Sequence, residues 1–117
     1  MLKNIKERIE RNESFIVAND GQFLGKLSMS QYDSESIMNK YGSYGSKYSS
    51  TSIFNQYSTY GSKYSSLSPF NMYTSTPPII YLRGRNVGLL TKNRYAGMNR
   101  IDPDELVDWM MYNNLRY

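Results

Sequence analysis

The chain has 117 residues, so its length allows one domain. Leu, Ile, Val and Phe make up only about a fifth of it, which is at the edge of the composition of disordered proteins. The 12 tyrosines supply large rings that can stand in for aliphatic residues in a core. There is no Cys and no His, which excludes disulfides, thiolate or imidazole metal sites, and nucleophilic mechanisms that use Cys or a His base.

Charge is distributed unevenly along the chain. The net charge is +4, and residues 36–101 contain eight Lys and Arg side chains but no Asp or Glu. A cationic segment of this length favours an anionic partner. The alternative is that these side chains only solubilise a Tyr/Ser-rich surface, with the acidic ends of the chain lying over it within the fold.

A short helix is predicted at each end of the chain. Residues 1–12 place apolar side chains on one stripe at spacings of three and four, with Asn12 as the stop; the stripe consists of Leu2, Ile5 and Ile9. The second helix, residues 102–114, begins with Asp102 as N-cap and a proline in its first turn. We expect Trp109 to anchor this helix in the core.

Two hairpins that resemble each other are predicted at residues 15–29 and 79–92. Each has an apolar strand, a glycine turn and a second glycine four residues later, and the two patterns are 63 residues apart. The turn glycines are Gly21 and Gly84, and the second glycines are Gly25 and Gly88. We expect the second glycine to mark a bulge or a close backbone approach, and the hairpins to pair into one four-stranded antiparallel sheet.

An internal repeat with a period of 16 residues fills the segment between the hairpins, residues 32–78. The copies begin at Tyr32, Tyr48 and Tyr64. Each contains a Ser-x-x-Asn block, an apolar residue before the Asn, and a second tyrosine two residues after it. The asparagines are Asn39, Asn55 and Asn71, the apolar residues are Met38, Phe54 and Phe70, and the second tyrosines are Tyr41, Tyr57 and Tyr73.

Each Ser-x-x-Asn block is predicted to form a capped turn. The serine oxygen accepts a backbone N–H, and the Asn closes the turn in a left-handed conformation or through an Asx bond. Each unit is expected to bury its Phe or Met and up to two tyrosines against the sheet. The recurring tyrosines and asparagines are thus interpreted as structural, whereas the lysines and the irregularly placed Tyr44 and Tyr60 are expected to face solvent.

The motif Tyr-Gly-Ser-Lys-Tyr-Ser-Ser-x-Ser-x-Phe-Asn-x-Tyr, followed by Pro-Pro and a glycine-turn strand pair, resembles small bacterial and phage-associated proteins of unassigned function. The resemblance covers about residues 19–95. It implies a shared folded module and no particular activity. The third copy departs from the pattern, because Pro69 stands where the first two copies have Ile37 and Ile53.

Catalytic chemistry has few candidates in this composition. Asp33 and Glu35 would face one way in an extended segment and could form a carboxylate pair, but they are better explained as surface acids at a loop entrance. The acids at 102–105 are explained by helix capping. Residues 42–47 are similar to a phosphate-binding glycine loop but have no strand-to-helix context. No catalytic residue, metal site or cofactor is predicted.

The sequence therefore predicts an α+β domain with a small antiparallel sheet, a three-unit repeat and a helix at each end. We expect a non-catalytic module that binds a protein or a small anionic ligand. The predicted contact residues are Lys40, Tyr44, Lys47, Tyr60, Lys63, Arg83 and Arg85. Alternatives are binding of single-stranded nucleic acid or nucleotides, a homo-oligomeric structural role, and an enzyme that uses carboxylates. With no signal peptide or membrane segment visible, a cytoplasmic location is expected.

Overall fold

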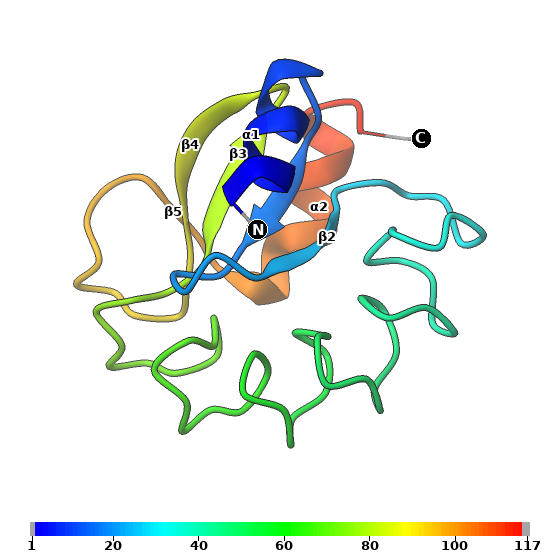
Figure 1. Cartoon of the computed structure of the whole chain (residues 1–117). Helices are drawn as coiled ribbons and strands as arrows, with labels where there is room; N and C mark the ends of the chain where they lie inside the picture. Colours follow the sequence, from blue (N-terminus) through cyan, green and yellow to red (C-terminus); the bar gives the residue numbers. More distant parts are fainter. Residues whose placement is uncertain (1, 116–117) are drawn as a thin grey trace.

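The computed structural model describes residues 2–115, without the side chains of Leu2 and Lys3, so the predicted place of Leu2 on the helix stripe lies outside the described residues. Five strands form one mixed sheet in the order β2-β1-β3-β4-β5 (Figure 1). The elements are α1 (Leu2–Glu10), β1 (Phe15–Val17), β2 (Phe23–Lys26), β3 (Ile79–Leu82), β4 (Arg85–Leu90), β5 (Arg100–Ile101), a 3-10 turn η1 (Pro103–Glu105) and α2 (Leu106–Tyr112). The expected α+β class is confirmed. Strand β5 was not predicted, and because it runs parallel to β4 the sheet is not purely antiparallel.

Antiparallel pairing joins β1 to β2, β1 to β3 and β3 to β4. Both of the second glycines have positive φ, at 118° for Gly25 and 149° for Gly88. A Cβ at Gly25 would lie 2.6 Å from Cγ2 of Ile37, and one at Gly88 would lie 2.3 Å from the carbonyl oxygen of Asn99. These positions therefore need glycine both for backbone conformation and for close approach.

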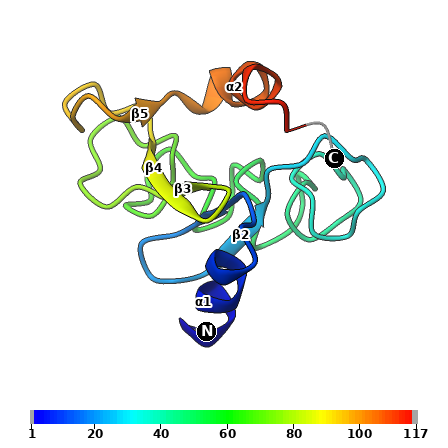
Figure 2. The same ribbon diagram turned by 90° about the horizontal axis from the view of Figure 1, so that it is seen from above.

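Strand β1 lies between the two helices, which cover opposite faces of the sheet (Figure 2). Phe15 and Val17 join a buried cluster with Ile5 of α1. Ile16, which points to the other face, joins the main core with Leu106 and Met110 of α2. Burial on both faces explains why the strand sequence Phe-Ile-Val shows no apolar–polar alternation.

Helix α1 is held to the sheet by a buried arginine. Arg8 is only 5% exposed, and its guanidinium carbon lies 3.7 Å from the centroid of the Phe23 ring. The same guanidinium forms ion pairs with Glu13 at 2.8 Å and Glu35 at 2.7 Å. Asn12, with φ of 57°, ends the helix in the left-handed region as predicted.

Residues 27–78, which we name the arc, sweep round one end of the sheet and α2 without forming a helix or strand (Figure 1). Side-chain oxygens accept the backbone N–H two residues later in three groups of four, with acceptors three residues apart within a group and seven residues apart between groups. The acceptors are Ser30, Asp33, Ser36, Asn39, Ser46, Ser49, Ser52, Asn55, Ser62, Ser65, Ser68 and Asn71. Backbone bonds that span three residues, such as Asn55 N–H to the Ser52 carbonyl, link these turns. The arc is thus built from three successive groups of ST and Asx turns.

The asparagines add a longer connection in each unit. The side-chain amide of Asn55 donates to the carbonyl of Ser49 at 3.0 Å, while its oxygen accepts the N–H of Tyr57 at 3.0 Å. Asn39 and Asn71 make the equivalent pairs of bonds. Each asparagine therefore closes its unit through an Asx bond and satisfies backbone groups that no sheet or helix would satisfy.

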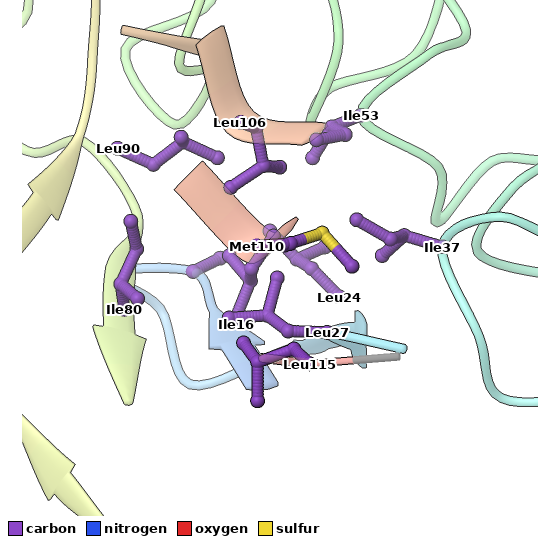
Figure 3. Packing of buried hydrophobic residues seen from close by; sticks show 11 residues of the cluster. Ile16, Leu24, Leu27, Ile37, Ile53, Ile80, Leu90, Leu106, Met110 and Leu115 are labelled. Carbon is purple, nitrogen blue, oxygen red and sulfur yellow. The ribbon is translucent and has the colours of Figure 1, made fainter. Parts of the chain in front are cut away.

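The arc contributes aliphatic residues to the core, and here the predicted burial is wrong by one position. Ile37 and Ile53, which are 2% and 1% exposed, point toward Leu106 and Met110 of α2 (Figure 3). Pro69 takes the same buried position in the third unit. The expected Met38, Phe54 and Phe70 are only half-buried. In each unit the oxygen of the serine two residues before accepts the N–H of this Met or Phe. The turn that this bond closes directs the side chain of the intervening residue, Ile37, Ile53 or Pro69, inward.

The recurring tyrosines are also placed opposite to the prediction. Their side chains are 83–99% exposed instead of being buried against the sheet; the six are Tyr32, Tyr41, Tyr48, Tyr57, Tyr64 and Tyr73. Each donates its backbone N–H to the Ser or Asn two residues before it. The turns therefore fix the backbone of each tyrosine, and its ring lies on the outside.

The C-terminal helical segment begins as predicted, with Asp102 accepting the N–H of Asp104 at 2.9 Å and a proline in the first turn. Its first residues form the 3-10 turn η1, and α2 follows. The buried residues of α2 are Leu106 and Met110. Trp109 is only half-buried beside the main core, so it is not the expected anchor.

Replacing Ile53 by alanine is predicted to lower the free energy of unfolding by about 2–5 kcal/mol, because it leaves a cavity between the arc and α2. The exposed Tyr57→Ala serves as a control and should change stability by no more than about 0.5 kcal/mol. Urea unfolding followed by circular dichroism measures both. Equal effects of the two substitutions would contradict the assignment of Ile53 to the core.

Candidate functional site

The structure divides the predicted contact residues among three places. Lys40, Lys47 and Lys63 are all exposed and lie along the arc. Arg83 and Arg85 lie at the turn between β3 and β4, beside the C-terminal end of α1 and away from the arc (Figure 1). The predicted single basic surface therefore does not form, because the β3–β4 hairpin carries its turn to the far end of the sheet.

Tyr44 and Tyr60 are half-buried rather than facing solvent. The ring of Tyr44 packs edge-on against Phe23, with centroids 4.9 Å apart. The hydroxyl of Tyr60 donates to Oδ2 of Asp20 at 2.8 Å and so ties the arc to the β1–β2 turn. These two tyrosines connect the arc to the sheet, which is the role the sequence analysis gave to the recurring ones.

Four open hollows follow one another along the arc, and the second and third reach inward to Ile37, Val107 and Ile53. Their volumes are about 450, 400, 620 and 660 Å³ in chain order. Met38 and Lys40 line both the first and the second hollow, and Phe54 lines both the second and the third. Lys63 and Tyr64 line both the third and the fourth. Because neighbours share lining residues, the hollows form one continuous surface, which we name the lysine–tyrosine track.

The track repeats with the sequence. The second hollow is lined by Gly45, Lys47, Tyr48 and Phe54, and the third by the residues 16 positions later; these are Gly61, Lys63, Tyr64 and Phe70. The first and fourth hollows correspond with an offset of 32 residues. An extended partner would therefore meet tyrosine rings at the same positions of each unit, whereas lysines recur only in the first two.

The track is cationic. None of the described residues that line it is Asp or Glu. The ion pairs within residues 2–115 do not involve Lys40, Lys47 or Lys63. Lys92, at the far end, is neutralised by Asp102 and Asp104. The three lysines of the arc thus remain available to an anion.

Aromatic rings alternate with these cations along the track. Tyr57 and Tyr64 both line the third hollow with Lys63, whose Nζ lies 5.3 Å from the centroid of the Tyr64 ring. Exposed tyrosine rings offer flat apolar faces at little entropic cost. The contact residues predicted from the sequence did not include these tyrosines. Their fixed period of 16 residues was the signal that could have indicated a repeated surface.

The only candidate acid pair is engaged in ion pairs. Nζ of Lys26 contacts Asp33 at 2.8 Å, and Arg8 contacts Glu35 at 2.7 Å. The hydrogen bond from Lys26 lowers the pKa of Asp33, and the hydrogen bond from Arg8 lowers the pKa of Glu35. Both carboxyls are therefore held ionised. In this arrangement they fix β2 and α1 to the first unit of the arc.

Comparison with known proteins gives no matching family model, curated protein or solved structure. Among residues 2–115, no group of three or more Asp or Glu side chains is arranged to hold a metal ion. Neither of the helices that the structure describes has the length and apolar character needed to cross a bilayer.

Glu35→Gln is predicted to reduce the acid sensitivity of the fold. The pKa of Glu35 is lower in the folded state than its ordinary value of 4.5, so its contribution to stability is present above that value and is lost as the pH falls through the folded pKa. Urea unfolding between pH 7 and acid pH should show a smaller loss of stability for the variant than for the wild type. The exposed Glu105→Gln is the control; if its slope changes as much, the prediction is wrong.

Tyr60→Phe is predicted to reduce the loss of stability at alkaline pH. Burial, together with the hydrogen bond to Asp20, raises the pKa of Tyr60 to about 12. The wild type should lose this contribution as the pH rises from the ordinary value of 10 to about 12. Unfolding measured across that range should fall less steeply in the variant, and an unchanged slope would contradict the Tyr60–Asp20 bond.

Proposed function

We propose that this chain is a non-catalytic binding module that holds an extended anionic partner along the lysine–tyrosine track. The observation that carries the proposal is the continuity of a surface that has available lysines, exposed rings and no acidic lining residue. Opposite charge attracts such a partner and speeds its encounter. The first two 16-residue units are proposed to supply both lysines and rings, and the third, which has no Lys or Arg, to supply rings beside Lys63.

The shape of the track favours an extended partner over a compact small ligand. Its cations are spread over successive hollows, with Lys40 and Lys47 in the second and Lys63 in the third and fourth. A small anion could reach only part of this set. A linear partner could contact every unit, and repeated weak contacts on one chain add up to a useful affinity.

The carboxylates support a binding role rather than catalysis. Asp33 and Glu35 are each held by a cation that lowers the pKa, whereas a general acid near neutral pH needs a raised one. Asp102 and Asp104 cap the C-terminal helical segment and bind Lys92. These acids are accounted for by contacts that stabilise the fold.

The test uses linear polyanions of different chemistry as probes: heparin, polyglutamate and a 12-residue oligothymidylate. The double variant Lys47→Ala/Lys63→Ala should lose at least tenfold in affinity for whichever probe the wild type binds. For an oligonucleotide, the slope of log affinity against log salt should become shallower by about 1.4, which corresponds to two phosphate contacts. Fluorescence anisotropy at several salt concentrations measures both quantities.

The matched control is Lys6→Ala/Arg85→Ala, which removes the same charge from exposed positions off the track. It should keep wild-type affinity to within about twofold. A wild type that binds none of the three probes would overturn the proposed function. Equal losses in both double variants would show that net charge alone, rather than the track, attracts the partner.

A further inference from the structure

The rings on the track have no role in a purely ionic contact. Six tyrosines of the arc are 83–99% exposed, although leaving so many large rings in water brings no stability to the fold. Tyr32 and Tyr41 line the first hollow, Tyr57 and Tyr64 the third, and Tyr64 and Tyr73 the fourth. A partner that uses them must present flat groups as well as negative charge, repeatedly, on one chain.

We infer that the partner is a single-stranded nucleic acid, bound with its phosphates on the lysines and its bases stacked on the tyrosines. The inference rests on the proposed function and names the chemical class of its partner. Sites for single strands without sequence preference combine a cationic groove with aromatic platforms, because every base has a flat π face. The first two units of the track provide both features, and Lys63 of the second unit also lines the fourth hollow beside Tyr64 and Tyr73 of the third.

Other linear partners use only part of the track. A duplex keeps its bases stacked inside, so the tyrosines would meet only sugar and phosphate. An acidic peptide would engage the lysines but has no regular series of flat groups. A neutral glycan could stack on the rings but would not use the lysines. Of these partners, only a single strand presents both phosphates for the lysines and flat bases for the tyrosines along the track.

The structure also specifies how the strand is recognised. Base identity is normally distinguished by Asn, Gln, Arg or Lys side chains that form paired hydrogen bonds with base edges. Asn39, Asn55 and Asn71 already direct both ends of their amides to backbone groups of the arc. The amides that recur in every unit are therefore occupied, and the exposed Gln31 and Gln56 line only the first and third hollows, so the track should bind different base sequences with similar affinity.

The first experiment separates bases from charge. A fluorescein-labelled 12-nucleotide oligothymidylate is compared with an abasic 12-mer of the same backbone charge and with a 12-base-pair duplex, a length within the 4–16 nucleotides that comparable sites cover. The wild type should bind the oligothymidylate at least tenfold more tightly than the abasic strand or the duplex. Equal binding of all three, with the proposed lysine dependence intact, would overturn this inference and leave the proposed function standing.

The second experiment tests a single ring. Tyr64→Ala should lower the affinity for the oligothymidylate at least about fivefold, the lower limit for loss of one stacked base. Tyr64→Phe keeps the flat face and should retain binding to within about twofold. Tyr112→Ala removes an equally exposed ring, 86% against 83%, from α2 and should have no effect.

Circular dichroism checks that each variant remains folded, which is expected because the Tyr64 side chain is exposed. An unchanged affinity in Tyr64→Ala would overturn the stacking model. A loss of affinity for the abasic strand equal to that for the oligothymidylate would do the same, since it would show that the ring contributes something other than stacking.

Discussion

The hydrogen bond from a short polar side chain to the backbone two residues away is the interaction on which this fold depends. Residues 27–78 have no ladder or helix to satisfy their peptide groups. Instead, Ser, Asp and Asn side chains, three residues apart within each group of turns, accept these backbone N–H groups. Backbone hydrogen bonds close the arc at both ends. Lys26 N–H donates to the Glu35 carbonyl at 2.7 Å, and Lys92 N–H donates to the Pro69 carbonyl at 2.9 Å. The chain is compact, with a radius of gyration of 12.8 Å, although it contains few aliphatic residues. This is possible because nearby side chains form hydrogen bonds with its backbone groups.

This local bonding also decides which side chains form the core and which form the surface. In each unit one turn directs a compact apolar side chain inward; Ile37 and Ile53 reach α2, and Pro69 is buried at the equivalent position. The tyrosines, whose N–H groups are used by the turn, are left outside. The same bonds that stabilise the arc thus display a regular row of rings and lysines, so folding and the proposed recognition have a common cause.

Much of the scaffold follows from local signals in the sequence. The glycines of the two hairpins, the Asp102–Pro103 helix start and the turn chemistry of the Ser-x-x-Asn blocks each depend on a few neighbouring residues. Strand β5 could not be found, because two residues without a turn signal pair with β4 only through the tertiary structure. Side-chain size favours burial of the Met, Phe and Tyr residues of the repeat, but the turn geometry instead buries the smaller side chains of Ile37, Ile53 and Pro69. Arg83 and Arg85 lie away from the lysines of the arc because of where the β3–β4 turn lies in the tertiary structure. No local sequence pattern indicates that position.

The arc leaves the sheet at β2 and returns at β3, and only β1 lies between these strands. Because β2 and β3 run parallel, its ends are separated by two strand spacings, about 10 Å, across the sheet and also by the length of these short strands along it, whatever the length of chain between them. Closing a loop of this size becomes only a few tenths of a kcal/mol more costly when 16 residues are added. The first unit is bonded to β2 and the third to the end of β4, but the middle unit, residues 48–63, is bonded mainly to its neighbours in the arc. An in-frame duplication or loss of this segment by genetic recombination would keep the remaining turns in register. Through this arrangement, the length of the lysine–tyrosine track can change in whole 16-residue units while the strand pairing of the sheet stays the same.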